Sequence, residues 1–440
     1  MSAAELSIVF FIQLFVIVAA ARLIGWLGKR FLGQPQVVGE MIAGVVLGPS
    51  LFGMLLPDLS AMIFPAESRS ILYVGAQLGV GLYMFLVGLG FDRSHFRANV
   101  GSAGAVSLSG MAAPFLLALL LAPWLLSEGL FNPEMSLAEA SLFLGACIAI
   151  TAFPMLARII HERGLSNSPL GTLSLSAGAI DDACAWGVLA VVLAIFGAGA
   201  AVAVKAIVSA LAFAVLMVGF GPRLFARLGA EAEKKGGIDN ALLGIVLMLF
   251  LLAAFAMDWA GMHAVFGGFL LGVAMPRGVL TREIRARLEP ITVVLLLPMF
   301  FTYSGLNTKL GVMTDPALFL IAAAILAASI LAKFGACWAA ARLTGQDNAT
   351  ALGIGALMNS RGLMELIIIN IGLQRGLIGV EFFSIMVLMA VVTTLMASPL
   401  FEIVYGRKAR QRGELGALAE VTDDPDGAAV STRGPAPGPR

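Results

Sequence analysis

Residues 144–160, LGACIAITAFPMLARII, resemble residues 352–368, LGIGALMNSRGLMELII, when Leu144 is placed over Leu352 at an offset of 208. Each stretch is apolar at both ends and interrupted in the middle, the first by Thr151 and Pro154. Proline lacks an N–H and clashes with the preceding turn of a helix. The second stretch has the polar run MNSRG at the same point. We therefore expect two helices that are each broken near the centre.

Two further pairs of stretches repeat in the same order along the chain. GEMIAGVVLGPS (39–50) matches HAVFGGFLLGVAMP (263–276), with Gly48 over Gly272 at an offset of 224. MFLVGLGFD (84–92) matches MFFTYSGLNT (299–308), with Gly88 over Gly305 at an offset of 217. The slow drift of the offset is typical of short loop deletions, so the chain is expected to contain an internal repeat.

The composition places this repeat in a membrane. Hydrophobic residues make up 59% and charged residues 12% of the 440, and the mean hydropathy is +0.95. A soluble domain has about 25% charged residues, so the chain is predicted to be an all-α polytopic membrane protein. The scattered net charge of +1 gives no support for nucleic-acid binding. No Walker A or GxGxxG context and no His/Cys cluster occurs, and no cofactor is expected.

A membrane-spanning helix needs about 20 mostly apolar residues, and this rule predicts thirteen spans. They are 6–28, 36–56, 69–90, 99–126, 136–161, 169–198, 200–222, 238–257, 259–275, 286–306, 316–342, 349–373 and 379–405. The Pro/Gly/Ala-rich tail, 406–440, is expected to be disordered.

Basic residues orient these spans. With the N-terminus outside, the predicted cytoplasmic loops hold eighteen Lys and Arg residues, and the outer loops hold four, Arg69, Lys205, Lys309 and Arg375. The positive-inside rule favours this topology. We expect a multi-pass protein of the cell (inner) membrane with a cytoplasmic C-terminus.

The repeated stretches pair spans two with nine, three with ten, and five with twelve, each seven spans apart. An odd separation reverses orientation, so the sequence predicts an inverted-topology repeat, a common basis of alternating access. Broken helices at matching depth are the best sequence pointer to a transporter binding site. The candidate residues there are Thr151, Asn359, Ser360, Arg361 and Gly362.

Two adjacent carboxylates, Asp181 and Asp182, lie within the apolar run around SAGAIDDACAW (176–186). Each Asp at a helix centre costs roughly 2.5–3.5 kcal/mol on insertion scales. Hydrogen bonding alone could be provided by Ser or Thr at lower cost. The two carboxylates repel, and burial disfavours their charge, so one is expected to exchange a proton for a metal cation within the cellular pH range.

The remaining charges within the spans are possible partners. Lys333 is the natural counter-ion for one aspartate. Arg361 and Glu365, at i and i+4, are expected to pair with each other or to compensate helix-end dipoles. Glu40 either lines the cytoplasmic entrance or ends a loop.

Three motifs are similar to those of the monovalent cation/proton antiporter superfamily, closest to its Kef-type and plant cation/H⁺ exchanger branch. They are QPQVVGEMIAGVVLGPSLFG (34–53), TAFPMLARIIHERGLSNSPLGTLSLSAGAIDDACAW (151–186) and MNSRGLMELIIINIG (358–372). The resemblance covers nearly all of residues 6–405. It implies a thirteen-span antiporter fold with crossed broken helices, a core domain and a dimerisation domain.

By this resemblance Asp182 is the cation- and proton-binding carboxylate and Asp181 is the preceding acidic residue. Lys333 is the lysine that pairs with the first Asp in electrogenic members, and Thr151 belongs to the first unwound stretch. The expected core is about 69–198 and 286–405, and the dimerisation scaffold is about 6–56 and 200–275. The resemblance is expected to leave out the C-terminal nucleotide-binding domain of full Kef proteins.

The sequence thus predicts a secondary antiporter, not an enzyme, that exchanges Na⁺ or K⁺ for protons at Asp182, is electrogenic, and forms a homodimer in lipid. Two alternatives stay open at this point: a sodium-coupled organic-anion symporter of related fold and a gated cation channel. The paired Asp speaks against an anionic substrate. An aspartyl protease would need two Asp on facing helices, and no GxGD occurs.

Overall fold

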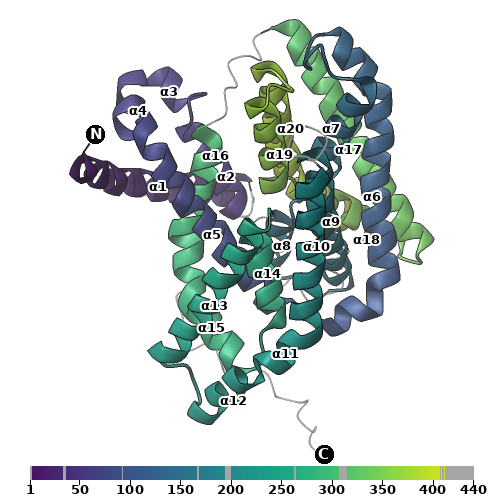
Figure 1. Ribbon diagram of the computed structural model, residues 1–440. Coiled ribbons are helices and arrows are strands. Elements are labelled where there is room, and N and C mark those ends of the chain that lie inside the picture. The colour runs from purple at the N-terminus through teal and green to yellow at the C-terminus, as the bar shows by residue number, and fades with distance from the viewer. Residues whose placement is uncertain are drawn as a thin grey trace, which may run out of the picture.

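The computed structural model describes residues 2–32, 36–91, 93–165, 168–193, 200–261, 264–306 and 315–406, together with 408 and 411. Lys309 and most of the predicted tail lie outside these ranges. The described chain is almost entirely helical (Figure 1). Its α-helices are α1 (Ala3–Leu32), α2 (Gln36–Leu47), α3 (Phe52–Leu55), α4 (Pro57–Ile63), α5 (Arg69–Gly90), α6 (Arg93–Ser127), α7 (Leu137–Ala149), α8 (Phe153–Glu162), α9 (Pro169–Leu193), α10 (Ala200–Val215), α11 (Gly221–Leu224), α12 (Ala226–Lys235), α13 (Asn240–Trp259), α14 (Ala264–Ala274), α15 (Val279–Ile291), α16 (Leu297–Leu306), α17 (Pro316–Leu343), α18 (Asn348–Met358), α19 (Leu363–Gln374) and α20 (Val380–Phe401).

Local sequence signals start the helices of the repeat. Ser136 and Glu139 form a capping box at the start of α7, in which each side chain accepts from the other residue's backbone N–H. Asp347 caps α18 by accepting from the N–H groups of Ala349 and Thr350. Burial acts to raise the pKa of Asp347, but hydrogen bonds from Lys408 and Thr350 outweigh it and hold that pKa well below its usual value.

The prediction of an all-α membrane protein is confirmed. Within the described residues, eight helical stretches are long and apolar enough to cross a membrane, and α7, α14 and α18 are shorter apolar helices. All thirteen predicted spans fall on helical segments, although their number stays a prediction. One boundary differs: the predicted span 36–56 ends as a helix at Leu47. Pro49 restricts the residue before it and stops α2 there.

The two expected breaks are present, and they touch. The fifth predicted span divides into α7 and α8, and the twelfth divides into α18 and α19. The N–H of Ala152 in the first break donates to the carbonyl of Ser360 in the second, at 3.0 Å. These two positions are 208 residues apart, the offset that relates Leu144 to Leu352. Equivalent points of the two halves therefore meet where the broken helices cross.

The other repeated stretches make equivalent contacts as well. A Cβ atom on Gly48, the residue after α2, would collide with the carbonyl of Gly305 of α16, so the two backbones approach closely. In the same way, Gly272 of α14 lies against Gly88 of α5. The sequence alignment pairs Gly48 with Gly272 and Gly88 with Gly305, so the α2–α16 contact and the α14–α5 contact are images of each other. This confirms the internal repeat.

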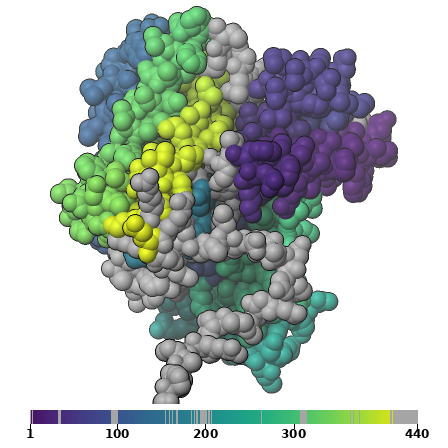
Figure 2. All heavy atoms as spheres, turned by 180° about the vertical axis from the view of Figure 1, so that it is seen from behind, coloured from purple at the N-terminus to yellow at the C-terminus, as the bar shows by residue number. Residues whose placement is uncertain are grey.

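The helices pack in two groups. In Figure 1, α1, α2, α5, α13, α14, α15 and α16 lie on one side and α6, α7, α9, α17 and α18 on the other. The strongest packing joins α5 to α14 and α16, and α16 to α2, whereas α6 packs on α7, α9 and α17. Viewed from behind, α20 lies beside α17 and α1 projects from the body (Figure 2). This packing groups α5 and α16 with α2 and α14. The assignment of 69–90 and 286–306 to the core stays a prediction.

Candidate functional site

Asp181 occupies the centre of the buried polar cluster. It lies on α9 and is fully buried. Its Oδ2 atom accepts from the backbone N–H of Thr151, at 2.8 Å, and from Lys333 Nζ, at 3.0 Å. Its Oδ1 atom accepts from Ser107 Oγ of α6, at 3.3 Å. Four elements thus converge on one carboxylate, and its charge is compensated by the Lys333 ion pair.

Two basic side chains gather at the C-terminal end of α7, which stops at Ala149. Lys333 Nζ donates to the carbonyl of Ala149 as well as to Asp181. Arg361 Nη1 donates to the carbonyl of Cys147, at 3.4 Å. The last carbonyls of a helix lack intrahelical partners and carry partial negative charge. Lys333 and Arg361 therefore satisfy carbonyls at the end of α7 beside the break.

The breaks are held to each other by side chains. Thr151 Oγ1 in the first break donates to the carbonyl of Met358 at the end of α18, at 2.9 Å. Thr394 of α20 accepts from the N–H of Arg361, at 3.0 Å, and is within 2.9 Å of its carbonyl. Arg361 Nη2 also donates to Ser329 Oγ, at 3.4 Å. The unwound backbone is thus fixed by hydroxyl groups rather than by helical hydrogen bonds.

Asp182 directly follows Asp181 on α9 and is 6% exposed, whereas Asp181 is fully buried. Successive residues on a helix are about 100° apart, so the two carboxylates point in different directions. The ion pair with Lys333 is therefore made by Asp181, and Asp182 faces another direction. A carboxylate of this kind can bind either a proton or a metal cation.

The other predicted residues surround this cluster. Asn359 and Ser360 are buried in the second break, and Asn359 Nδ2 donates back to Gly355, at 3.0 Å. Glu365, on α19, is 1% exposed, and neither of its carboxylate oxygens has a hydrogen-bond partner in the described part of the chain. Arg361 therefore donates hydrogen bonds to Cys147 and Ser329 and not to Glu365. Glu40 is buried on α2, in the first group of helices.

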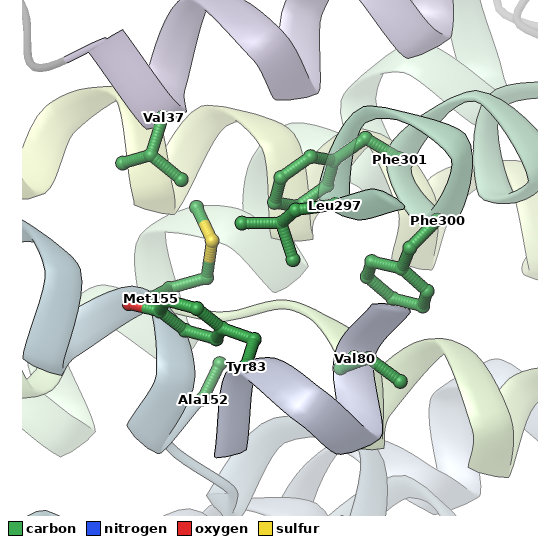
Figure 3. A pocket seen from close by; sticks show the side chains of 8 residues that line it. All are labelled: Val37, Val80, Tyr83, Ala152, Met155, Leu297, Phe300 and Phe301. Carbon is green, nitrogen blue, oxygen red and sulfur yellow. The ribbon is translucent and has the colours of Figure 1, made fainter. Parts of the chain in front are cut away.

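Two apolar cavities reach the crossing from the seam between the two helix groups. The first, shown in Figure 3, is lined by side chains that converge from α2, α5, α8 and α16 around Ala152 of the first break. The second is lined by Gly362 of the second break, by α19 and α20, and by α2 and α16. Phe300 and Phe301 of α16 line both. The seam beside the crossing is thus apolar.

Sequence reasoning missed Ser107, Ser329 and Thr394. Each is a fully buried hydroxyl that bonds to Asp181 or Arg361. The only sequence signal was a hydroxyl residue in the middle of an apolar span, which is common in membrane helices. Only their tertiary neighbours distinguish them from other serines and threonines.

The comparisons with known proteins agree on one family. The model of the family described as "Sodium/hydrogen exchanger, transmembrane" matches residues 16–404. The chain is 38% identical over 400 residues to the Na⁺/H⁺ antiporter NhaS4 of Synechocystis, covering 89% of this chain and 96% of that protein. It is 30% identical to the K⁺/H⁺ antiporter 1 of Saccharomyces cerevisiae, covering 90% of this chain but 46% of the yeast protein. The chain thus spans nearly all of the first relative and about half of the second.

A solved structure shows the same fold. The sodium/proton antiporter MjNhaP1 of Methanocaldococcus jannaschii superposes with a TM-score of 0.59 at 14% identity, covering 94% of this chain and all of that one. The antiporter fold that the family resemblance implies is confirmed, and the number of spans stays a prediction.

Proposed function

Because the chain belongs to the sodium/hydrogen exchanger family and is a cation/proton antiporter, we propose that Asp182 is the carboxylate at which cation and proton exchange. The observation that carries this assignment is the pairing of Asp181. Lys333 and two further donors hold Asp181 in place, so the charge that a substrate cation meets is that of Asp182.

Competition for Asp182 couples the two fluxes. The carboxylic acid releases its proton to one side of the membrane, and the resulting carboxylate binds one Na⁺ or K⁺. On the other side the cation leaves and a proton returns. An empty, ionised Asp182 is costly to bury, so the site crosses the apolar seam only when it carries a proton or a cation.

Lys333 is proposed to carry the second proton of an electrogenic cycle. Its ammonium is fully buried and its charge is balanced by Asp181. Arrival of a cation at the neighbouring Asp182 repels this ammonium, which then releases a proton. The net exchange is two protons for one cation.

Alternating access is proposed to move the core, α6–α9 and α17–α20, against a scaffold that contains α2, α5, α14 and α16. The apolar lining of the seam supports this division, because apolar surfaces slide without breaking hydrogen bonds. We further propose a homodimer in the inner membrane, with the N-terminus outside, and Glu40 at the cytoplasmic entrance. Asn359, Ser360, Arg361 and Glu365 are proposed to compensate the ends of the broken helices.

The test is proton flux in proteoliposomes that hold a pH gradient, to which Na⁺, K⁺, Li⁺ and Rb⁺ are added in turn. Asp182→Asn is expected to abolish the cation-triggered collapse of the gradient. Asp258→Asn is the matched control, because Asp258 is exposed at the end of α13, and it is expected to exchange like wild type.

Exchange retained in Asp182→Asn would remove Asp182 from the site. Cation flux without proton movement in wild type would favour a channel, and sodium flux that requires an organic anion would favour a symporter.

A further inference from the structure

Glu365 is a buried carboxylate whose position is not explained by hydrogen bonds to it within the described residues. It is 1% exposed on α19, and both carboxylate oxygens lack a hydrogen-bond donor within the described residues. Arg361 lies one turn earlier, and its terminal nitrogens donate to the carbonyl of Cys147 and to Ser329 Oγ. A buried carboxylate without a donor is costly when ionised and far less so when protonated.

The charges that act on Glu365 belong to the ion-binding cluster. Arg361 and Lys333 are the cations that interact with it. Among the described elements, α7 and α20 pack most closely on α19, and α2 and α16 share the second cavity with it. The titratable residue of α2 is the buried Glu40. From α7 the titratable neighbour is the Cys147 thiol. On α20 the titratable residue is Glu381, which is exposed at the far end, and the buried polar groups there are neutral hydroxyls.

Within the proposed moving core, α6–α9 and α17–α20, the buried charged side chains of the described residues are Asp181, Asp182 and Glu365 against Lys333 and Arg361. Lys333 is paired with Asp181. A proton on Glu365 therefore neutralises the Glu365 carboxylate, and a proton on Asp182 neutralises the Asp182 carboxylate, as two separate events. Gly362 and Leu366, on either side of Glu365 along the chain, line the second cavity, so this turn of α19 borders the seam.

We propose that Glu365 is a second proton-binding carboxylate of the core, separate from Asp182, whose protonation sets the pH range in which the cation site works. Its carboxyl group releases a proton as pH rises. The negative charge that remains then holds protons and cations more strongly at the other core sites. This inference rests on the proposed exchange at Asp182.

The test compares Glu365→Gln, which is neutral at every pH, with Glu365→Asp, which still titrates, and with the exposed control Glu381→Gln. Exchange is measured from pH 6 to 9. Glu365→Gln is expected to retain exchange, with its half-maximal pH shifted about one unit toward acid, because a missing unit charge in the core weakens proton binding nearby. Its KM for the cation at high pH is expected to rise about tenfold for the same reason. The other two variants are expected to follow wild type.

An unchanged pH profile in Glu365→Gln overturns the proposal, as does complete loss of exchange in a folded Glu365→Gln protein, which would place Glu365 in the transport step. Infrared difference spectra between low and high pH give a readout that does not need transport. In an Asp182→Asn background, the band of a protonated carboxyl is expected to titrate and to disappear when Glu365→Gln is added. Absence of that titrating band overturns the proposal, whereas exchange retained in Asp182→Asn alone overturns the assignment of Asp182.

Discussion

At the scale of single residues, Lys333 links the broken helix to the aspartate pair. It is fully buried and reaches both the end of α7 and the Asp181 carboxylate. Coulomb attraction is strong in this low-dielectric setting, but so is the cost of removing two charges from water. The pair is thus better understood as mutual neutralisation that permits two charges in the core than as a large net source of stability.

This view predicts a characteristic pair of mutants. Lys333→Ala leaves Asp181 buried without its cation and is expected to lower the free energy of unfolding by about 3–5 kcal/mol. Lys333→Ala combined with Asp181→Asn removes both charges and is expected to recover most of that loss. Thermal unfolding in detergent measures the stability of the single and the double variant, with exposed Lys205→Ala as the control. A double mutant as unstable as the single one would contradict the charge argument.

At the scale of elements, the sequence predicted the two breaks because Pro154 and the polar run at 359–362 cannot continue an apolar helix. It predicted the repeat because close backbone contacts demand glycine at matching positions. It did not predict the end of α2 at Leu47, since hydropathy is insensitive to Pro49. It also left the partner of Arg361 open, because the i, i+4 rule assumes a continuous helix and α19 begins only at Leu363.

The glycine contacts are predicted to be equally sensitive in the two halves. Gly305→Ala and Gly88→Ala each place a Cβ against the backbone of the facing helix, and overpacking of this kind costs about 1–3 kcal/mol. Gly244→Ala on α13 is the matched control, because no atom lies within 4 Å of its added Cβ, and alanine is favoured over glycine in a helix by roughly 1 kcal/mol. The thermal unfolding temperature is therefore expected to fall for Gly305→Ala and Gly88→Ala and to stay or rise for Gly244→Ala. Tolerance of either repeat glycine change would show that these helices can separate.

At the scale of the whole molecule, the symmetry of the repeat and the division into two helix groups both favour access to the site from either side of the membrane. Two crossed breaks with equivalent contacts give a site that is similar when approached from either side. The apolar seam that contains Phe300 and Phe301 separates this site from the scaffold. If the core moves as a unit, contacts across the seam change during each cycle and contacts within a group persist.

Crosslinking distinguishes these two kinds of contact. Phe153 of α8 and Phe269 of α14 face each other across the seam with ring centroids 5.4 Å apart. Phe85 of α5 and Phe250 of α13 lie within the scaffold at 5.8 Å. In a background without native cysteines, a thiol crosslinker is expected to stop exchange in Phe153→Cys/Phe269→Cys, reversibly with reductant if the linker is cleavable. The same treatment of Phe85→Cys/Phe250→Cys is expected to leave exchange intact. The division predicted from sequence places α5 in the core, and the packing places it in the scaffold. Inhibition by the Phe85→Cys/Phe250→Cys crosslink would therefore return α5 to the moving part. Exchange that survives the Phe153→Cys/Phe269→Cys crosslink would mean that α8 and α14 do not move apart.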